Sequence, residues 1–294
     1  MAVNHPSGPR NLAIEQARSL LFVPGHRQDR FGKALDSSAD AVVLDLEDAV
    51  ALDMKAQARA SIAAAWPGFS EAQRMRLLVR INPFNTDDYS EDVHMLQSLP
   101  GLGAVMLPKA ESPKQIEQLG QACPQLAVLP LIETAEGVAQ MESLASTHGV
   151  VRLALGHLDL QADLGISCSD DEAELAPVRL AMVVTSRRAC LAAPVDGVTT
   201  SIDDERVLLK DTHRSRRFGF GAKLCIHPSQ VAVVHAALSP TPEECAWAQR
   251  VLQAQAASGG SAFSLDGKMV DAPVVLRARQ ILNRCCPASI TDTS

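Results

Sequence analysis

Two carboxylates, Glu133 and Asp159, each stand just after an apolar run of the kind that forms a buried strand. The two runs follow one another along the chain, so neighbouring parallel strands would bring both acids to one edge of a sheet. Mg²⁺ is usually held by one or two carboxylates together with water and substrate oxygens. The alternative is that each acid caps the helix that follows it. We favour a metal site because both acids share this placement and no Cys/His spacing typical of a softer metal is present.

A second set of charged residues ends the two apolar runs at 41–46 and 77–81. The first run ends in an acidic cluster, Asp45, Glu47 and Asp48, and the second run contains Arg80. An interior arginine needs a partner, so Arg80 could pair with these acids as pure structure. It could also present its planar guanidinium to a substrate carboxylate. The two roles are compatible, and Arg18 is a further candidate cation for the acidic cluster.

Several basic residues allow more than one interpretation. Lys109 follows the run at 104–107 directly; it is either a Schiff-base nucleophile or one half of an ion pair, and we favour the ion pair. His227 and His26 are at least as easily explained as hydrogen-bonded loop residues. The basic group at 214–217 is most simply a solvated helix face, with phosphate binding as the alternative.

The elements that must position these residues are short apolar runs, each followed by a helical pattern. Near-continuous apolar strands that alternate with helices indicate a parallel sheet covered on both faces. Eight runs with polar residues at their ends predict an α/β fold of the (β/α)₈ TIM barrel type, whose active sites lie at the strand C-termini. An open doubly wound sheet is the alternative. The runs are 19–23, 41–46, 77–81, 104–107, 126–132, 151–155, 195–200 and 222–226.

The pattern changes after Gln230. We assign residues 11–238 to a barrel catalytic domain and residues 239–294 to a C-terminal helical extension, or lid, that docks on this barrel or on a neighbour. Thr241 is the expected N-cap of its first helix, with Glu244 three positions later. A Gly/Ser-rich hinge, a hairpin-like stretch and a last helix from about 272 to 284 complete the extension.

Composition excludes several classes of function. The chain has 294 residues, of which 47% are hydrophobic and 21% charged, and its net charge is −7. Without a basic stripe, a nucleic-acid partner is not expected. Seven scattered cysteines predict reduced thiols and not a disulfide framework. No apolar run is long enough for a membrane span, so we expect a cytoplasmic protein. P-loop, Rossmann, G-x-S-x-G and zinc motifs are also missing from the sequence.

A series of ordered motifs spans residues 18–230: RSLLFVPG, LDLEDAV, VRIN, LPK, LIETAEG, LGHLDL and GAKLCIHPSQ, with SLDGKMVDAPVV in the tail. Together they resemble the citrate lyase β-subunit-like family of the HpcH/HpaI aldolase superfamily. The resemblance implies a (β/α)₈ barrel with Mg²⁺ bound by Glu133 and Asp159. It also implies that Arg80 grips the α-carboxylate of a 2-oxo acid, and that Asp271 acts in the site of an adjacent subunit. His157 and Leu158 depart from the family pattern and put the substrate's identity in doubt.

The implied reaction is a reversible retro-aldol cleavage of a carboxylate-bearing 3-hydroxyacyl-CoA of the citramalyl, malyl or citryl type, which gives a 2-oxo acid and acetyl-CoA. We expect a carbon–carbon lyase that is a homotrimer or hexamer. The alternatives are a malyl-type CoA thioesterase, a citrate lyase β subunit that acts on a citryl-carrier protein thioester, and a non-catalytic scaffold. The expected catalytic residues are Arg80, Asp271 and Glu47, and the expected substrate contacts are Arg80, Arg18, Asp45 and Lys109.

Overall fold

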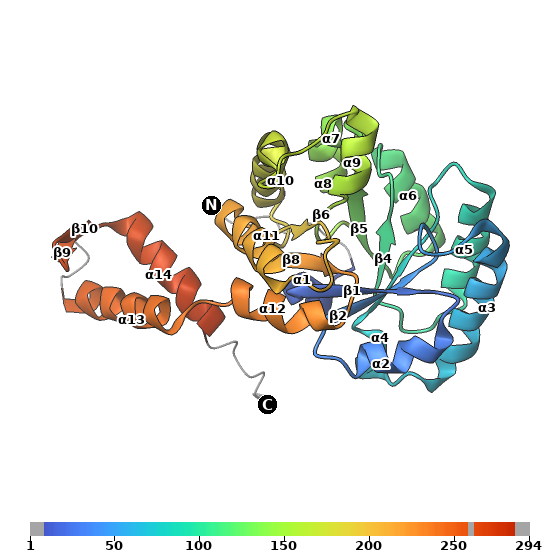
Figure 1. The fold of residues 1–294 in the computed structure, drawn as a ribbon, viewed down its shortest axis with the longest axis horizontal. Coiled ribbons are helices and arrows are strands. Elements are labelled where there is room, and N and C mark those ends of the chain that lie inside the picture. The colour runs from blue at the N-terminus through green and yellow to red at the C-terminus, as the bar shows by residue number, and fades with distance from the viewer. Residues whose placement is uncertain (1–8, 258–261, 286–294) are drawn as a thin grey trace. The chain divides into compact units, whose positions relative to one another are not determined.

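The computed structural model describes residues 9–257 and 262–285, and its central feature is a closed barrel of eight parallel strands (Figure 1). The strands follow chain order around the barrel, and β8 closes it by pairing with β1. The predicted (β/α)₈ barrel is therefore confirmed. The strands are β1 (Ser19–Pro24), β2 (Ala41–Asp45), β3 (Leu77–Arg80), β4 (Ala104–Leu107), β5 (Ala127–Ile132), β6 (Ala154–Leu155), β7 (Val195–Asp196) and β8 (Ala222–Cys225).

Helices surround the barrel and connect its strands. Among the described residues none of them is long and apolar enough to cross a membrane. The barrel helices are α1 (Leu12–Gln16), α2 (Phe31–Leu35), α3 (Lys55–Ala65), α4 (Glu71–Arg74), α5 (Asp87–Gln97), α6 (Pro113–Ala122), α7 (Ala135–Ala139), α8 (Met141–Ala145), α9 (His157–Leu164), α10 (Ala176–Arg188), α11 (Glu205–Phe218) and α12 (Ser229–Leu238).

Alternate residues of each strand fill the barrel interior with apolar side chains. Val43 of β2, Leu78 of β3 and Leu131 of β5 belong to this one buried cluster. Because side chains on a strand alternate between its two faces, the position two residues further along each strand has the same orientation. Those positions are Asp45 at the end of β2, Arg80 at the end of β3, and Glu133 directly after β5. The strand pattern therefore carries three charged side chains to the C-terminal mouth of the barrel.

The opposite end of the barrel is closed by the segment that contains α1. Ile14 belongs to the barrel core and is fully buried. Arg152, which is 1% exposed, holds this segment by donating from Nη1 to the carbonyl oxygens of Ile14 (3.1 Å) and Ala17 (2.6 Å). Because buried backbone carbonyls need donors, these bonds stabilise the plug at the strand N-termini.

Two strands are shorter than the sequence indicated. The run at 151–155 forms a strand only over its last two residues and the run at 195–200 only over its first two, and between them the long helix α10 begins at Ala176. Glu172 has a φ of 50°, in the left-handed region that a helix cannot contain, and a 3-10 turn follows it. Pro177 lies in the first turn of α10, where its missing N–H has no consequence.

Residues 236–294 form a second compact unit. Its described part contains α13 (Pro242–Ala257), an antiparallel hairpin of β9 (Phe263–Leu265) and β10 (Lys268–Val270), and α14 (Ala272–Cys285). The predicted capping box is present, since the Thr241 N–H donates to Glu244 at 2.9 Å and the Glu244 N–H donates to the Thr241 hydroxyl at 3.2 Å. What this extension does for catalysis stays a prediction.

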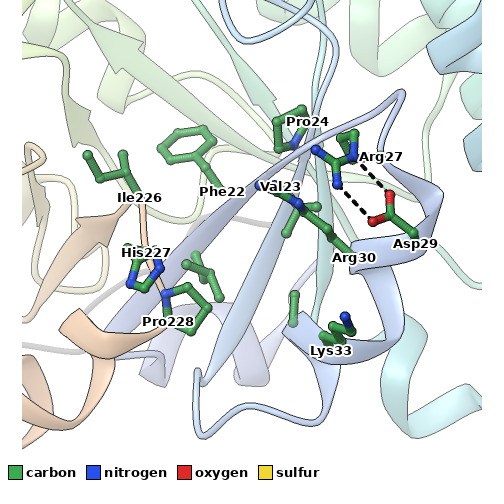
Figure 2. A pocket seen from close by; sticks show the side chains of 12 residues that line it. Phe22, Val23, Pro24, Arg27, Asp29, Arg30, Lys33, Ile226, His227 and Pro228 are labelled. Atoms are coloured by element: carbon green, nitrogen blue, oxygen red, sulfur yellow. Dashed lines mark hydrogen bonds and ion pairs between the residues drawn. The ribbon is translucent and has the colours of Figure 1, made fainter. Parts of the chain in front are cut away.

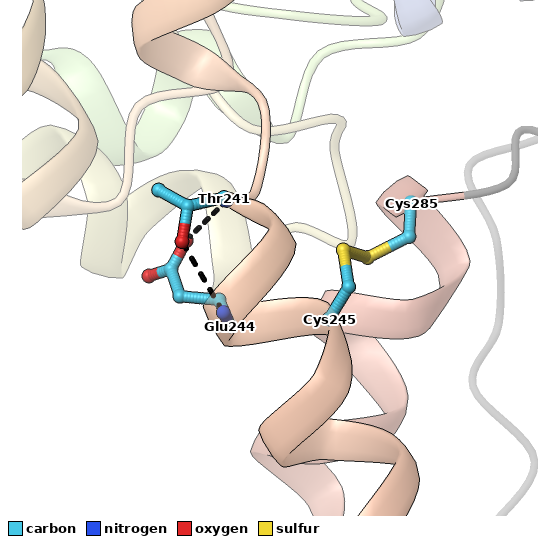
Figure 3. The surroundings of a disulfide bond; sticks show 4 residues. All are labelled: Thr241, Glu244, Cys245 and Cys285. Carbon is cyan, nitrogen blue, oxygen red and sulfur yellow. Dashed lines mark hydrogen bonds between the residues drawn. A yellow bond between two sulfur atoms is a disulfide. The ribbon is translucent and has the colours of Figure 1, made fainter.

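Cysteine pairing in the second unit corrects one expectation. Cys245 of α13 and Cys285 of α14 form a disulfide (Figure 3), so the expectation of reduced thiols throughout is wrong for this pair. Cys123, Cys168, Cys190 and Cys225 are free. The disulfide fastens together two helices that already share a small apolar core around Ala248, Val251 and Val275.

Candidate active site

Arg80 ends β3 at the barrel mouth and has acidic partners on two edges of its guanidinium. Nε and Nη2 donate to the two oxygens of Asp45 at 2.7 and 2.6 Å, a bidentate pair between register partners of β3 and β2. Nη1 lies 2.8 Å from Oε2 of Glu47 and 3.4 Å from Asp48. Burial lowers the pKa of Arg80, but the charges of Asp45 and Glu47 outweigh it and raise that pKa. The guanidinium is thus charged and rigidly oriented.

The face of the Arg80 guanidinium covers the ring of Phe22, at 4.8 Å from the ring centroid. Its edge towards Glu47 is held less tightly than its edge towards Asp45. The 2.8 Å contact with Glu47 Oε2 is a close approach of charges without the geometry of a hydrogen bond, which leaves that buried oxygen without a donor. This edge is therefore the one that a bound carboxylate could engage with least disruption.

Glu47 and Glu133 are joined through Lys109. The Lys109 ammonium lies 3.0 Å from Oε1 of Glu47, and the Lys109 backbone N–H donates to Oε1 of Glu133 at 2.8 Å. Burial raises the pKa of Glu47, although Arg80 and Lys109 oppose the shift. The favoured prediction of an ion pair at Lys109 is confirmed by this contact.

Glu133 is the most perturbed acid at the mouth. Burial, and then the charge of Glu47, raise its pKa to about 8. Its Oε1 accepts the Lys109 N–H, but its Oε2 is buried without any partner. Gly156 leaves the space for this carboxylate, since a Cβ at that position would lie 2.4 Å from Oε2. Leaving a buried carboxylate oxygen without a hydrogen-bond donor costs free energy. A cation bound at Oε2 would remove that cost.

Asp159 approaches the same place from α9. It is exposed in the first turn of that helix, and its charge contributes to the raised pKa of Glu133. Asp163 of the same helix accepts the Ala135 N–H at 2.7 Å, which ties α9 to the start of α7 beside Glu133. In the described part of the chain, no set of three or more His, Cys, Asp or Glu side chains is arranged to hold a metal. Glu133 and Asp159 offer a smaller arrangement, in which two carboxylates are completed by water and substrate oxygens.

Two basic residues, Arg18 and Arg214, differ in location or exposure from what we predicted. Arg18 precedes β1 and therefore lies at the N-terminal end of the barrel, where its Nε donates to Asp40 at 3.1 Å. The structure does not bring Arg18 to Glu47 or Arg80. Arg214 is buried and donates to Glu172 at 3.0 Å, so the expectation of a solvated helix face is wrong for this residue.

A pocket of about 460 Å³ opens beside the C-terminal ends of β1 and β8 (Figure 2). Its lining includes Arg27, Arg30 and Lys33, together with the apolar side chains of Phe22 and Ile226. Arg27 pairs with Asp29 at 2.8 Å. Our sequence interpretation missed this pocket, although three basic residues at intervals of three after a strand were a signal.

Two further predicted residues have local structural roles. His227 lines the same pocket, and its Nδ1 lies 2.7 Å from the Ser229 hydroxyl, as expected of a hydrogen-bonded loop residue. Asp271 precedes α14 in the second unit, where its carboxylate accepts the Val274 N–H at 3.5 Å. A helix-capping acid of this kind keeps one oxygen available for other contacts.

Comparison with known proteins gives consistent results. The family described as HpcH/HpaI aldolase/citrate lyase matches residues 18–228. A citrate lyase subunit beta-like protein of Deinococcus radiodurans is 34% identical over 276 residues, which cover 90% of this chain and 96% of the relative. The mitochondrial citramalyl-CoA lyase of Mus musculus is 31% identical, with coverage of 95% and 87%. A (3S)-malyl-CoA thioesterase of Cereibacter sphaeroides is also 31% identical, with coverage of 90% and 93%.

Solved structures agree with the sequence relatives. The protein CitE from Mycobacterium tuberculosis, in complex with magnesium, acetoacetate and coenzyme A, superposes with a TM-score of 0.83 and 35% identity. The match covers 92% of this chain and 99% of that one. A citrate lyase beta subunit from M. tuberculosis complexed with oxaloacetate and magnesium matches with a TM-score of 0.70 and 34% identity, over 78% of this chain and 100% of that one.

Proposed function

Because this chain belongs to the HpcH/HpaI aldolase/citrate lyase family and is a carbon–carbon lyase, we propose that it cleaves a carboxylate-bearing 3-hydroxyacyl-CoA. The products are a 2-oxo acid and acetyl-CoA, and the reaction is reversible and requires Mg²⁺. One observation carries the proposal: Arg80, Glu47, Lys109 and Glu133 form a continuous set of contacts at the barrel mouth.

The residues present fit a bound Mg²⁺. Oε2 of Glu133 is buried without a partner, and burial, followed by the negative charge of Glu47, raises the pKa of that acid. Glu133 and Asp159 would hold the ion, with water and substrate oxygens as the other ligands. When bound, Mg²⁺ supplies Lewis-acid polarisation of the oxygen that becomes the carbonyl of the 2-oxo acid. The relatives solved with magnesium support Mg²⁺ as the bound ion.

Arg80 binds the carboxylate next to the reacting carbon. Asp45 fixes the guanidinium by two hydrogen bonds, so little conformational freedom is lost when substrate binds. The Nη1 edge faces the less tightly held acid, Glu47. A preoriented cation at the site of charge development is an effective form of catalysis.

Glu47 accepts the proton of the substrate hydroxyl. Burial raises the pKa of Glu47 and makes it a stronger base than an exposed glutamate. The Lys109 ammonium, 3.0 Å from Oε1, opposes this shift and so favours release of the proton afterwards. Loss of that proton lets the carbon–carbon bond break. The bonding pair passes to the thioester fragment, which becomes an enolate.

The pocket lined by Arg27, Arg30 and Lys33 receives the phosphate groups of the CoA moiety. Its cations match the charge of those groups, and Phe22 and Ile226 provide an apolar wall. Phe22 also lies under the Arg80 guanidinium. This one side chain therefore borders both the pocket and the charged cluster, by which we mean Arg80, Glu47, Lys109 and Glu133. We therefore assign phosphate binding to this pocket and not to the basic group at 214–217.

Asp271 of a neighbouring subunit protonates the enolate carbon to give acetyl-CoA. This role comes from the family resemblance of the KMVDAPVV segment and requires a homo-oligomer, which we expect to be a homotrimer or hexamer. The substrate is a citramalyl, malyl or citryl thioester. A relative named as a thioesterase supports hydrolysis as a second candidate function. A relative from Haemophilus influenzae named citrate lyase subunit beta supports a citrate lyase β subunit as a third.

Product analysis tests these alternatives. Purified protein is incubated with Mg²⁺ and malyl-, citramalyl- or citryl-CoA, and the products are identified by mass. A lyase yields a 2-oxo acid and acetyl-CoA, whereas a thioesterase yields free CoA and a hydroxy acid. The proposal fails if neither a 2-oxo acid nor acetyl-CoA forms from any of the three thioesters.

A further inference from the structure

A buried lysine beneath the charged cluster has no role in the reaction proposed so far. Lys55, the first residue of α3, is 6% exposed. Its ammonium donates to the carbonyl oxygens of Leu46 at 2.6 Å and Glu47 at 2.7 Å, and to Oδ1 of Asn82 at 2.6 Å. All three acceptors are neutral. Burying an ammonium is costly, and an apolar side chain would fill the space without that cost.

The acceptors belong to the two segments that carry the active-site side chains. Leu46 and Glu47 follow β2, and the Leu46 N–H donates to the Arg80 carbonyl oxygen at 2.9 Å. Asn82 follows Arg80 by two residues. One ammonium therefore ties the backbone of Glu47 to the segment of Arg80, and these two side chains approach each other at 2.8 Å.

The Asn82 side of this connection is itself fixed. Both the backbone N–H and the amide of Asn82 donate to Oδ2 of Asp92, each at 2.7 Å, and Asp92 is fully buried. The other oxygen of Asp92 accepts from Arg59 at 3.0 Å. Arg59 lies one turn after Lys55 on α3, so a closed ring of hydrogen bonds returns to the helix where it began.

We propose that Lys55 is a positioning residue that holds Glu47 against Arg80 by binding the backbone of one segment and the Asn82 amide of the other. Lys55 does not touch substrate. This inference rests on the proposed function, because it assigns Lys55 a role only through Glu47 and Arg80. Small displacements at a site of this kind cost about 10²-fold in rate.

The test compares Lys55→Met with Lys223→Met. Lys223 is 1% exposed and its ammonium donates to the Gly197 carbonyl oxygen at 2.8 Å, but it has no bond to either active-site segment. Both variants lose a buried ammonium and both should lose stability. Only Lys55→Met should lower kcat, by about 10²-fold, while the affinity for free coenzyme A stays unchanged in both.

A double-mutant cycle with Asn82→Ala separates positioning from general damage. If Lys55 and Asn82 act through one connection, the double variant should lose no more kcat than the more damaging single variant. Losses that multiply would overturn the proposal. So would equal kcat losses in the Lys55→Met and Lys223→Met variants.

Hydrogen exchange gives a readout that does not depend on activity. The amides of residues 46–50 should exchange faster in Lys55→Met and at the normal rate in Lys223→Met. Unchanged protection of that segment in Lys55→Met would overturn the proposal. An unsubstituted protein without lyase activity would count against the proposed function, and the exchange experiment would still decide whether Lys55 holds the segment.

Discussion

Lys109 donates its backbone N–H to Oε1 of Glu133 at 2.8 Å from a left-handed conformation, with a φ of 45°. Residues with a side chain adopt this region rarely, and at a cost. One oxygen of the acid thus has a donor, whereas the other is buried without a partner.

Glu133→Gln and Asp159→Asn should each lower turnover by at least about 10²-fold while the fold is kept. Each amide preserves the shape of the acid and removes the charge that attracts Mg²⁺. Titration calorimetry with Mg²⁺ should show binding lost in both variants. Glu136→Gln, at an exposed acid that bonds to Gln140, is the matched control and should bind normally. Near-normal Mg²⁺-dependent activity in either active-site variant would refute the metal assignment.

The raised pKa of Glu133 predicts how the stability of the metal-free protein depends on pH. Its value of about 8, against an ordinary 4.5, means that the folded state binds this proton more tightly than the unfolded state does. The resulting stabilisation is fully present below pH 4.5 and is lost as the pH rises through 8. In EDTA, the free energy of unfolding from urea titrations should fall over this range more steeply than in Glu133→Gln.

Mg²⁺ should reverse that trend, because the ion binds the deprotonated carboxylate. The increase in melting temperature at a fixed Mg²⁺ concentration should grow between pH 6 and pH 8. An increase that is independent of pH would show that the ion binds elsewhere.

Arg80→Lys should be nearly as damaging as Arg80→Ala, with a loss of about 10²–10³ in kcat/KM. Lysine keeps the charge, but it cannot bond to both oxygens of Asp45 and also present a second edge to substrate. Steady-state kinetics of the two variants decide the matter. If lysine restores most of the activity, Arg80 contributes charge alone.

Mixed oligomers test whether Asp271 of one subunit completes the active site of its neighbour. Asp271→Asn and Glu133→Gln subunits should each be inactive alone and should regain activity when co-expressed, because some mixed interfaces then contain one complete site. Asp271→Asn alone should still bind Mg²⁺ and a 2-oxo acid. Mixed oligomers that are confirmed by mass yet remain inactive would return Asp271 to its role at the start of α14.

Much of the barrel could be predicted because parallel strands covered on both faces leave long apolar runs in the sequence. The polar residues at the ends of those runs also predicted that charged side chains would gather at the mouth. Arg18 was placed wrongly, although its position was informative: a residue that precedes a strand lies at the opposite end of the barrel from one that follows it. Arg18 binds Asp40 at that other end.

Other features depend on contacts between distant segments and left no local pattern. The Cys245–Cys285 disulfide requires α13 and α14 to lie side by side across a separation of 40 residues. The raised pKa of Glu133 depends on burial by remote parts of the chain and on the charge of Glu47, a residue 86 positions earlier by numbering (133 − 47). The placement of Lys55 beneath Glu47 likewise follows from how α3 packs.

Gly156 leaves the space for Glu133, the acid that we propose binds Mg²⁺, so the residue at this one position of a sequence reports on that site. A methyl group there would fall 2.4 Å from Oε2 of Glu133 and 2.6 Å from its Cβ, so even alanine cannot share the space with that side chain. When genomes are searched for chains of this kind, any other residue at this position should mark a protein in which the acid has moved. Such chains would be candidates for lost or altered chemistry even where the acid itself is still encoded.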